Sequence, residues 1–295
     1  MKKYFIIKSK YPCDDGKIKN IYYYVKLEYN DNGCTMNVGN PKKSPCVIII
    51  INKNQTATIQ SVYFKEKIKC YLLHTKYSKS VIKNVLKCSL LLAIKIFKNI
   101  DIFSLTDNSM IECGPDEISL ADYYYIKYGK TWYQYNFNAK PKNKRVVHGL
   151  ENIFKRLMKK KMKNNSKDEL IEYCSKYYNN IDEIIKFIDE HYYENITFGE
   201  FIKSLMNDKT DCAIYSYVFI KVFGNVLYGT EWKISKKSIR KYKDDTYYII
   251  KQVNEIKSNK NINKFIKLVN SINKINKNIW KTNGPHFSNE KEANP

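Results

Sequence analysis

The feature that most restricts the fold of this chain is a short apolar run at residues 46–51, with the sequence CVIIII. Pro45 precedes the run and residues 52–54 (NKN) follow it. An apolar run with such boundaries is typical of a central β-strand that is buried on both faces. We therefore expect a sheet that contains this strand and is covered on each side.

Three further strands are expected before residue 65. Residues 3–8 and 21–29 (IYYYVKLEY) are rich in β-branched and aromatic side chains, which favour strands. The turn-forming residues 30–33 (NDNG) follow the second of these strands. Residues 56–64 (TATIQSVYF) are the expected hairpin partner of the apolar run.

The hydrophobic period then changes. Between residues 80 and 97 the apolar residues recur at helical spacing, which predicts a helix with a broad apolar stripe. A strand is expected at 100–105, a helix at 118–128 with Gly129 as its C-terminal cap, and a last strand at 131–137 (TWYQYNF). The predicted order is four strands, helix, strand, helix and strand.

Residues after 141 are expected to be mostly helical, which makes the chain an α+β protein. We predict an α/β domain at 1–140, a helical domain at 141–281 and a disordered tail at 282–295. Within the helical domain we expect a short strand or hairpin at 226–234, then two longer helices. The last of these carries an apolar stripe that packs on its own domain or lies on a membrane surface. The other expected helices are 148–162, 168–178, 181–191, 197–207 and 212–223.

The formal charge is +23, and only three of the 52 basic residues are arginine. A basic excess favours nucleic acid or acidic proteins as partners. The same Lys- and Asn-rich composition also results from A/T-rich codons, so both explanations of the charge remain open. Because arginine is preferred for bidentate contacts to phosphate and guanine, its scarcity favours nonspecific binding. The densest basic run, residues 159–163 (KKKMK), is a solvated helix end or a phosphate contact.

The eight cysteines include no C-x-x-C pair, and the four histidines are not closely spaced, so no metal site is expected. We predict free thiols in a reducing, intracellular compartment. No apolar run approaches the roughly 18 residues of a membrane span, and no signal peptide is expected. Nucleotide-binding, zinc-protease and serine-hydrolase motifs are also absent from the sequence.

The first 140 residues resemble GNAT-type N-acetyltransferases in the order of their predicted elements. The sharpest match is residues 121–129 (ADYYYIKYG), which is similar to that family's A-x-x-x-Y-x-K-x-G-F pattern, with Lys130 in place of Phe. The resemblance implies that Tyr125 is the general acid that protonates the thiolate of coenzyme A. A packed aromatic side chain is the alternative role for Tyr125.

The sequence departs from that family where the cofactor should bind. The family's pyrophosphate loop is rich in glycine, whereas residues 65–80 contain none. The strand that often carries a general base offers Gln60 and no carboxylate, which leaves His74 as the candidate base. No cofactor is expected unless the resemblance holds for activity, in which case acetyl-CoA would contact the start of the following helix. The candidate cofactor-binding residues there are Lys76, Ser78, Lys79 and Ser80.

The whole chain also resembles uncharacterised proteins of large, A/T-rich DNA viruses. The shared segments are residues 104–109 (SLTDNS), 129–133 (GKTWY), 197–201 (TFGEF) and 231–234 (EWKI). This resemblance implies a viral origin and no particular activity. Asp107 and Ser109 lie at the end of a strand, where open α/β sheets place ligands, although an Asx turn would explain them equally well.

Two functions therefore remain open. The first is a non-catalytic viral protein with a degenerate acetyltransferase-like domain, which binds nucleic acid or an acidic protein nonspecifically. The second is a divergent acyl-CoA-dependent N-acetyltransferase. We expect the protein in the host cell cytoplasm, with packaging in the virion as a further option. The tyrosine runs 22–24 and 123–125 are either base-stacking surfaces or packed core residues.

Overall fold

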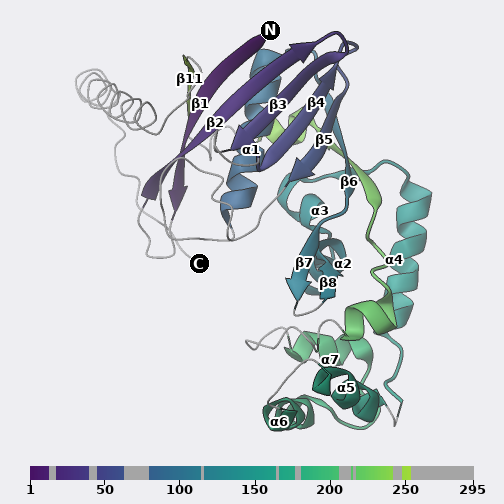
Figure 1. Cartoon of the computed structure of the whole chain (residues 1–295). Helices are drawn as coiled ribbons and strands as arrows, with labels where there is room; N and C mark the ends of the chain where they lie inside the picture. Colours follow the sequence, from purple (N-terminus) through teal and green to yellow (C-terminus); the bar gives the residue numbers. More distant parts are fainter. Residues whose placement is uncertain are drawn as a thin grey trace, which may run out of the picture.

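The structure is a computed structural model, and Figure 1 shows the whole chain. It describes residues 1–12, 18–39, 45–62, 80–113, 116–163, 166–176, 181–205, 214, 217–241 and 248–253. A large twisted sheet carries one helix, α1, against one of its faces, and a group of short helices lies at the opposite end of the molecule (Figure 1). The α+β class expected from the sequence is confirmed.

The sheet has nine strands in the order β11-β1-β2-β3-β4-β5-β6-β10-β9. All neighbouring strands run antiparallel except β5 and β6, which are parallel. The strands are β1 (Lys2–Pro12), β2 (Ile18–Asn30), β3 (Gly33–Gly39), β4 (Val47–Asn52), β5 (Ala57–Val62), β6 (Ile102–Asp107), β9 (Lys140–Pro141), β10 (Thr230–Ser235) and β11 (Tyr248–Val253). The apolar run at 46–51 supplies β4, which lies near the middle of this sheet as expected. The expected burial on both faces is wrong, because Val47, Ile49 and Ile51 are buried whereas Ile48 and Ile50 on the other face are half-buried.

The strands predicted before residue 106 are confirmed, but β3 was missed. Its side chains alternate between buried and half-buried, with Cys34, Met36 and Val38 on the buried side. That alternation was visible in the sequence, although polar Thr35 and Asn37 dilute the apolar character of the segment. The hairpin turn before Gly33 is therefore the link from β2 to β3.

Helix α1 (Ser80–Ile96) covers one face of the sheet and confirms the predicted helix. Its side chains from Val85 to Ile94 join inward-facing residues of the sheet in one hydrophobic core. Trp132, Phe137 and Trp232 complete that core from later parts of the chain. The hydrophobic core of the sheet is thus completed by residues that lie far apart in the sequence.

The strand predicted at 131–137 is wrong, because these residues form helix α3 (Trp132–Phe137). Thr131 and Gln134 make a reciprocal capping box, and Asn138 ends the helix with a positive φ of 49°. Aromatic residues favour strands only weakly, and the helix start signal at Thr131 with the stop signal at Asn138 outweighs that preference. Trp132, Tyr133 and Phe137 are buried by the helix instead.

Helix α2 (Leu120–Tyr128) lies where a helix was predicted, with Ser119 as N-cap and Gly129 at φ 64° as the C-terminal cap. A small two-stranded ribbon, β7 (Met110–Cys113) and β8 (Asp116–Ser119), precedes it. Sequence reasoning placed residues 118 and 119 in the helix and gave no structure to 110–117.

Most of the helices predicted after residue 141 are confirmed. They are α4 (Lys144–Met158), α5 (Ser166–Ser175), α6 (Ile181–His191), α7 (Phe198–Leu205) and the π-helix η1 (Tyr217–Phe223). These helices pack with α2 around a second hydrophobic core that includes Phe154, Phe201 and Phe219. Helix α4 runs along the side of the molecule from the level of the sheet to the lower helices (Figure 1).

The chain returns to the sheet after the helices. β10 confirms the strand expected within 226–234, and a short helix, α9 (Lys236–Arg240), follows it. The prediction of two long helices after Ile234 is wrong over residues 248–253, because these form β11 and pair with the free edge of β1. The predicted amphipathic helix near the end and the predicted tail at 282–295 lie outside the described residues.

The expected domain boundary at 140 stays a prediction, yet both cores draw residues from either side of it. Trp232 and Ile239 belong to the core of the sheet, whereas Ile118 and Tyr125 belong to the second core. Cys34, Cys88 and Cys174 are free thiols, but Cys46 is bonded in a disulfide, so the expectation of free thiols is wrong for that residue. Within the described residues, every helix is too short or too polar to cross a membrane.

Candidate functional site

The parallel strands β5 and β6 are the place where an acetyltransferase-like cofactor site would lie. They are joined through α1, and their ladder contains only two residue pairs, Ala57 with Phe103 and Thr58 with Ser104. Both strands then continue, to Val62 and to Asp107, without pairing to each other. The strands therefore separate toward their carboxyl ends, where open sheets place ligands.

Tyr125, the sequence-predicted general acid, lies in the second core and not in the core of the sheet. Its ring packs edge-on against Phe154, with the two centroids 5.2 Å apart. Burial, and secondly the charge of Glu151, raise the pKa of Tyr125 to about 12. This environment is that of a packed aromatic side chain on the inner face of α2.

Of the other predicted site residues, only Gln60 and Ser80 lie within the described residues. His74, Lys76, Ser78 and Lys79 lie outside the described residues, so their predicted roles stay predictions. Ser80 is the first residue of α1. Gln60 lies exposed on β5.

Asp107 is the most unusual residue at the end of β6. Its side chain is only 1% exposed. Its Oδ1 accepts the backbone N–H of Ser109 at 3.3 Å, which is the Asx turn that the sequence offered as the alternative to a ligand site. Its Oδ2 is buried and has no hydrogen-bond partner. Burial raises the pKa of Asp107 to about 6; hydrogen bonds from Ser109 oppose this rise and the charge of Asp122 adds to it.

Asp122 is a second buried carboxyl, and sequence reasoning did not single it out. It is fully buried in the first turn of α2, and its Oδ1 accepts the backbone N–H of Leu227 at 2.9 Å. Its Oδ2 is also buried without a partner. Burial raises the pKa of Asp122 to about 6, although hydrogen bonds from Ser119 and Leu227 oppose this. The signal in the sequence was an aspartate three residues after the N-cap Ser119.

Tyr133 of α3 completes this buried polar cluster. Its side chain is 3% exposed, and burial together with the charge of Asp107 raises its pKa. Carboxyls that hold protons near neutral pH are suited to acid–base chemistry. Because Asp107, Asp122 and Tyr133 are all enclosed, no substrate contacts them in this conformation. The carboxyl of Asp122 holds Leu227 to α2, and the carboxyl of Asp107 caps the local turn at Ser109.

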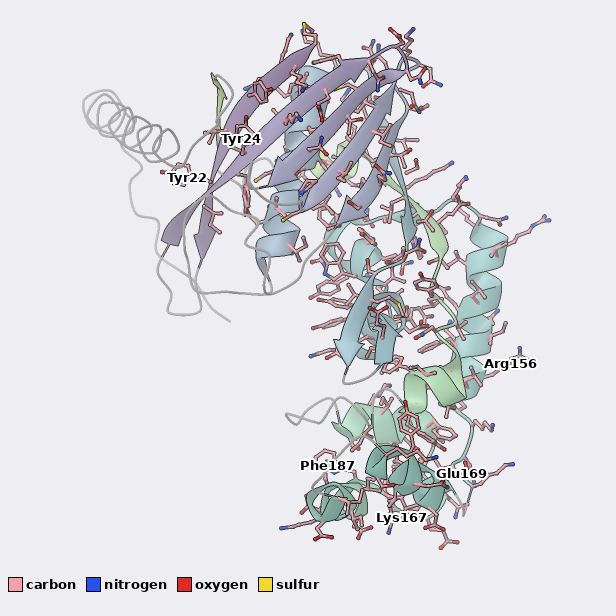
Figure 2. The ribbon with its side chains drawn as sticks, in the orientation of Figure 1. Tyr22, Tyr24, Arg156, Lys167, Glu169 and Phe187 are labelled. Carbon is pink, nitrogen blue, oxygen red and sulfur yellow. The ribbon has the colours of Figure 1, made fainter. Side chains whose placement is uncertain are left out.

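The tyrosine runs noted in the sequence are mostly packed. Tyr22 and Tyr24, labelled on the sheet in Figure 2, are buried, as is Tyr23 between them. Tyr124 is half-buried beside the buried Tyr125. Packing, rather than base stacking, explains these residues.

Two other tyrosines form an exposed stack, and we call this pair with its flanking lysines the tyrosine surface: Lys127, Tyr128, Lys130 and Tyr135. The rings of Tyr128 and Tyr135 stack with centroids 4.6 Å apart and planes 27° apart. Tyr128 is 40% exposed and Tyr135 is 52% exposed. The ammonium of Lys127 lies 5.6 Å from the centroid of the Tyr128 ring, and Lys130 is exposed just after α2.

The ring of Tyr124 packs against both rings of this stack. Its ring lies 5.1 Å from that of Tyr128 and 6.3 Å from that of Tyr135, measured between centroids. Because Tyr124 is half-buried, it fixes the two exposed rings on the body of the protein. Sequence reasoning missed the surface because it placed Tyr135 in a strand.

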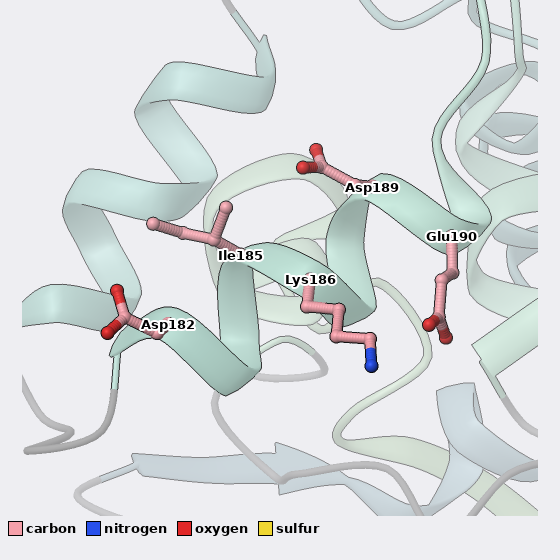
Figure 3. Close-up of a pocket in the computed structure, with 5 residues that line it drawn as sticks. All are labelled: Asp182, Ile185, Lys186, Asp189 and Glu190. Atoms are coloured by element: carbon pink, nitrogen blue, oxygen red, sulfur yellow. The ribbon is translucent and has the colours of Figure 1, made fainter.

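Two shallow hollows on the surface are less informative. One lies on α6 and is lined by Asp182, Ile185, Lys186, Asp189 and Glu190 (Figure 3). All five residues come from a single helix, and Asp189 already pairs with Lys167. The other hollow is lined by Asp101 and by residues of α9 that include Lys237 and Arg240. Within the described residues, acidic, histidine and cysteine side chains form no group of three that could hold a metal ion.

The exposed side of α4 is basic. It carries Arg145 and Lys155, and Figure 2 shows Arg156 near its lower end. The lysine run after α4 is also exposed at 159–161 and 163, in agreement with its expected place at a helix end. Part of the positive charge of the chain is therefore displayed on the outside of this helix and on the run that follows it.

Comparisons of the chain with protein-family models, with curated proteins and with solved structures found no match. The resemblances to N-acetyltransferases and to viral proteins therefore stay predictions.

Proposed function

We propose that this protein is a non-catalytic binding protein that holds single-stranded nucleic acid on its tyrosine surface. The observation that supports this proposal is the exposed stack of Tyr128 and Tyr135 beside Lys127 and Lys130. Single-stranded nucleic acids are bound by aromatic rings on which bases stack, with basic side chains along the phosphates. Both parts of that arrangement lie together here.

The arrangement also favours unpaired bases over a duplex. In a duplex the base faces are stacked on one another, so exposed tyrosine rings have no face to contact without unstacking. A single strand presents these faces freely, and every base offers one. The ligand is therefore recognised as a flexible polyanion with accessible rings, largely independent of its sequence.

The charge of the chain agrees with nonspecific binding. The net charge of +23 attracts a polyanion over a distance set by the salt concentration. The tyrosine surface carries lysine and no arginine, and lysine acts on phosphate as a point charge without bidentate geometry. We therefore expect a strong dependence of affinity on salt and a weak dependence on base sequence.

The test is fluorescence anisotropy of a labelled oligothymidylate at low salt. The double variant Tyr128→Ala/Tyr135→Ala is expected to bind at least about tenfold more weakly, since each stacked base contributes about 1–3 kcal/mol. Tyr193→Ala is the matched control, because Tyr193 is an exposed tyrosine on another part of the molecule. Circular dichroism of each variant checks that the fold is retained.

The salt dependence tests the lysines separately. Lys127→Gln and Lys130→Gln should each reduce the slope of log affinity against log salt by about 0.7, the value for one phosphate contact of a single strand. The proposal is wrong if the wild-type protein does not bind the oligonucleotide at low salt. It is also wrong if Tyr193→Ala weakens binding as much as the double variant does.

A divergent acyl-CoA-dependent N-acetyltransferase is the second candidate function. It is favoured by one observation, the separation of parallel strands β5 and β6 after two residue pairs. In this case acetyl-CoA would lie between the carboxyl ends of these strands. Calorimetric titration with acetyl-CoA tests it, and an absence of binding at millimolar cofactor excludes it. Tyr125→Phe should then leave acetyl-CoA binding unchanged but reduce acetyl transfer, if Tyr125 is the acid.

A further inference from the structure

The turn at residues 224–229 joins the two halves of the fold. It follows η1 of the second core and leads into β10 of the sheet. Leu227 of this turn belongs to the second core, and Trp232, shortly after it, belongs to the first. Any change in how this turn is held alters the connection between the sheet and the helices.

Three hydrogen bonds hold the turn to β6 and α2. The N–H of Leu227 donates to Oδ1 of Asp122 at 2.9 Å. The N–H of Gly229 donates to the backbone carbonyl of Asp107, also at 2.9 Å. In return, the N–H of Ser119 donates to Oδ1 of Asn225 at 2.9 Å. One of the three bonds is thus made to a buried carboxyl itself, that of Asp122, and a second is made to the backbone of Asp107, whose own carboxyl is buried.

Each of these carboxyls keeps one oxygen without a partner. Oδ2 of Asp107 and Oδ2 of Asp122 are both enclosed and make no hydrogen bond. An ionised carboxylate in this position keeps its bonds at Oδ1 but loses the hydration of Oδ2 without a compensating bond there, which is costly. A protonated carboxyl loses much less on burial, because it carries no charge. The closed turn is therefore compatible with a proton on each side chain and is opposed by ionisation.

The neighbouring charges do not offset this cost. Asp107 faces Asp122 and the hydroxyl of Tyr133, and neither can supply a positive charge. Glu231 on β10 is turned outward, where its carboxylate pairs with Lys142 at 2.8 Å in solvent. Among the described residues, no cationic side chain influences either carboxyl.

From this geometry we infer that Asp107 and Asp122 form a proton-operated lock on the turn at 224–229. When both carboxyls are protonated the lock is closed, and the turn ties the helices to the sheet. When they ionise the turn opens more often, because opening allows water to reach the two charges. Mildly acidic conditions therefore make the junction rigid, and neutral conditions loosen it.

The direction and size of the effect follow from linkage. Burial raises the pKa of both carboxyls from 3.8 to about 6. Below 3.8, the pKa of the hydrated group, the carboxyl is protonated in both states and the closed state keeps its full stability. As the pH rises through the closed-state pKa, ionisation favours the open state and that stability is lost. Between pH 4.5 and pH 7 each carboxyl should make opening about 20-fold more frequent if opening hydrates it fully.

Hydrogen exchange measured by mass spectrometry tests the lock. The peptide that covers residues 224–230 is compared with the peptide of β4 at 47–52, which serves as an internal reference for the intrinsic pH dependence of exchange. In the wild-type protein the protection of the turn relative to β4 should fall at least about 20-fold between pH 4.5 and pH 7. The variants Asp107→Asn and Asp122→Asn should each show a smaller fall and a better protected turn at pH 7.

The control variant is Asp182→Asn, which removes an exposed carboxyl from α6. It should leave the pH profile of the turn unchanged. A wild-type profile that is flat between pH 4.5 and pH 7 overturns the inference without any variant. So does a profile that keeps its slope in both Asp107→Asn and Asp122→Asn, or one that the α6 control flattens equally.

Discussion

Two helical glycines offer a direct test of how the second core is packed. Gly149 lies on the exposed side of α4, and a Cβ atom added there meets no atom within 4 Å. Gly199 lies in the first turn of α7, where an added Cβ would stand 2.7 Å from the carbonyl oxygen of Met158. The same substitution, glycine to alanine, should therefore have opposite effects at the two positions.

The magnitudes follow from these surroundings. Gly149→Ala should raise the free energy of unfolding by about 0.5–1 kcal/mol, because alanine has the higher helix propensity. At Gly199 the neighbour is backbone, and the end of α4 is tied to the start of α7 by the bonds Met162 N–H to Ile196 O at 2.9 Å and Phe198 N–H to Lys160 O at 3.0 Å. Relieving the contact must shift a helix, so Gly199→Ala should lower the free energy of unfolding by about 1–3 kcal/mol.

Urea unfolding followed by far-UV circular dichroism measures both values. The two variants and the wild type should share one m-value, so that the midpoints report stability directly. If Gly199→Ala proves as stable as Gly149→Ala, then α7 does not approach α4 as closely as described, and the account of the second core is incorrect.

Three further substitutions test other parts of the fold by the same unfolding measurement. Thr131→Ala removes the Oγ1 acceptor of the Gln134 N–H, one of the two bonds of the capping box, and should cost about 1 kcal/mol; a neutral result would mean that α3 is held by burial alone. Phe154→Ala removes a ring that packs against Tyr125 and Phe223 and should cost about 3–5 kcal/mol, whereas a loss below about 1 kcal/mol would place that ring at the surface. Gly33→Ala puts a Cβ at φ 144° and 2.1 Å from a carbonyl oxygen of β4, and should cost at least about 2 kcal/mol; wild-type stability would refute the β3–β4 register.

The sequence was informative wherever the local pattern and the long-range environment agree. The apolar run at 46–51 is a strand because its own side chains and its central place in the sheet favour the same conformation. Residues 131–137 were misjudged because aromatic content suggested a strand, while the pair Thr131 and Gln134 encoded a helix start. In that case a specific capping signal was available and was outweighed by composition.

The remaining errors come from distance along the chain. Nothing near residues 248–253 indicates that β1 has an unpaired edge, about 240 residues earlier, that they can extend. The same holds for Asp122, whose partner Leu227 is 105 residues away and whose burial depends on the return of the chain to the sheet. Asp107 was noticed because it ends a predicted strand and can form a local Asx turn with Ser109, whereas the missing partner of its Oδ2 is a property of the complete fold.

The late arrival of β10 affects the order in which the chain can be assembled during synthesis. β6 ends at residue 107, and the strand that pairs with its outer edge begins at residue 230. At a synthesis rate of about 5–20 residues per second, the ribosome needs about 6–25 s to make the intervening stretch. Throughout that interval the nascent sheet offers an unpaired strand edge, which is a template for aggregation. A chaperone that shields exposed strands should therefore improve the yield of this protein more than one that acts after release.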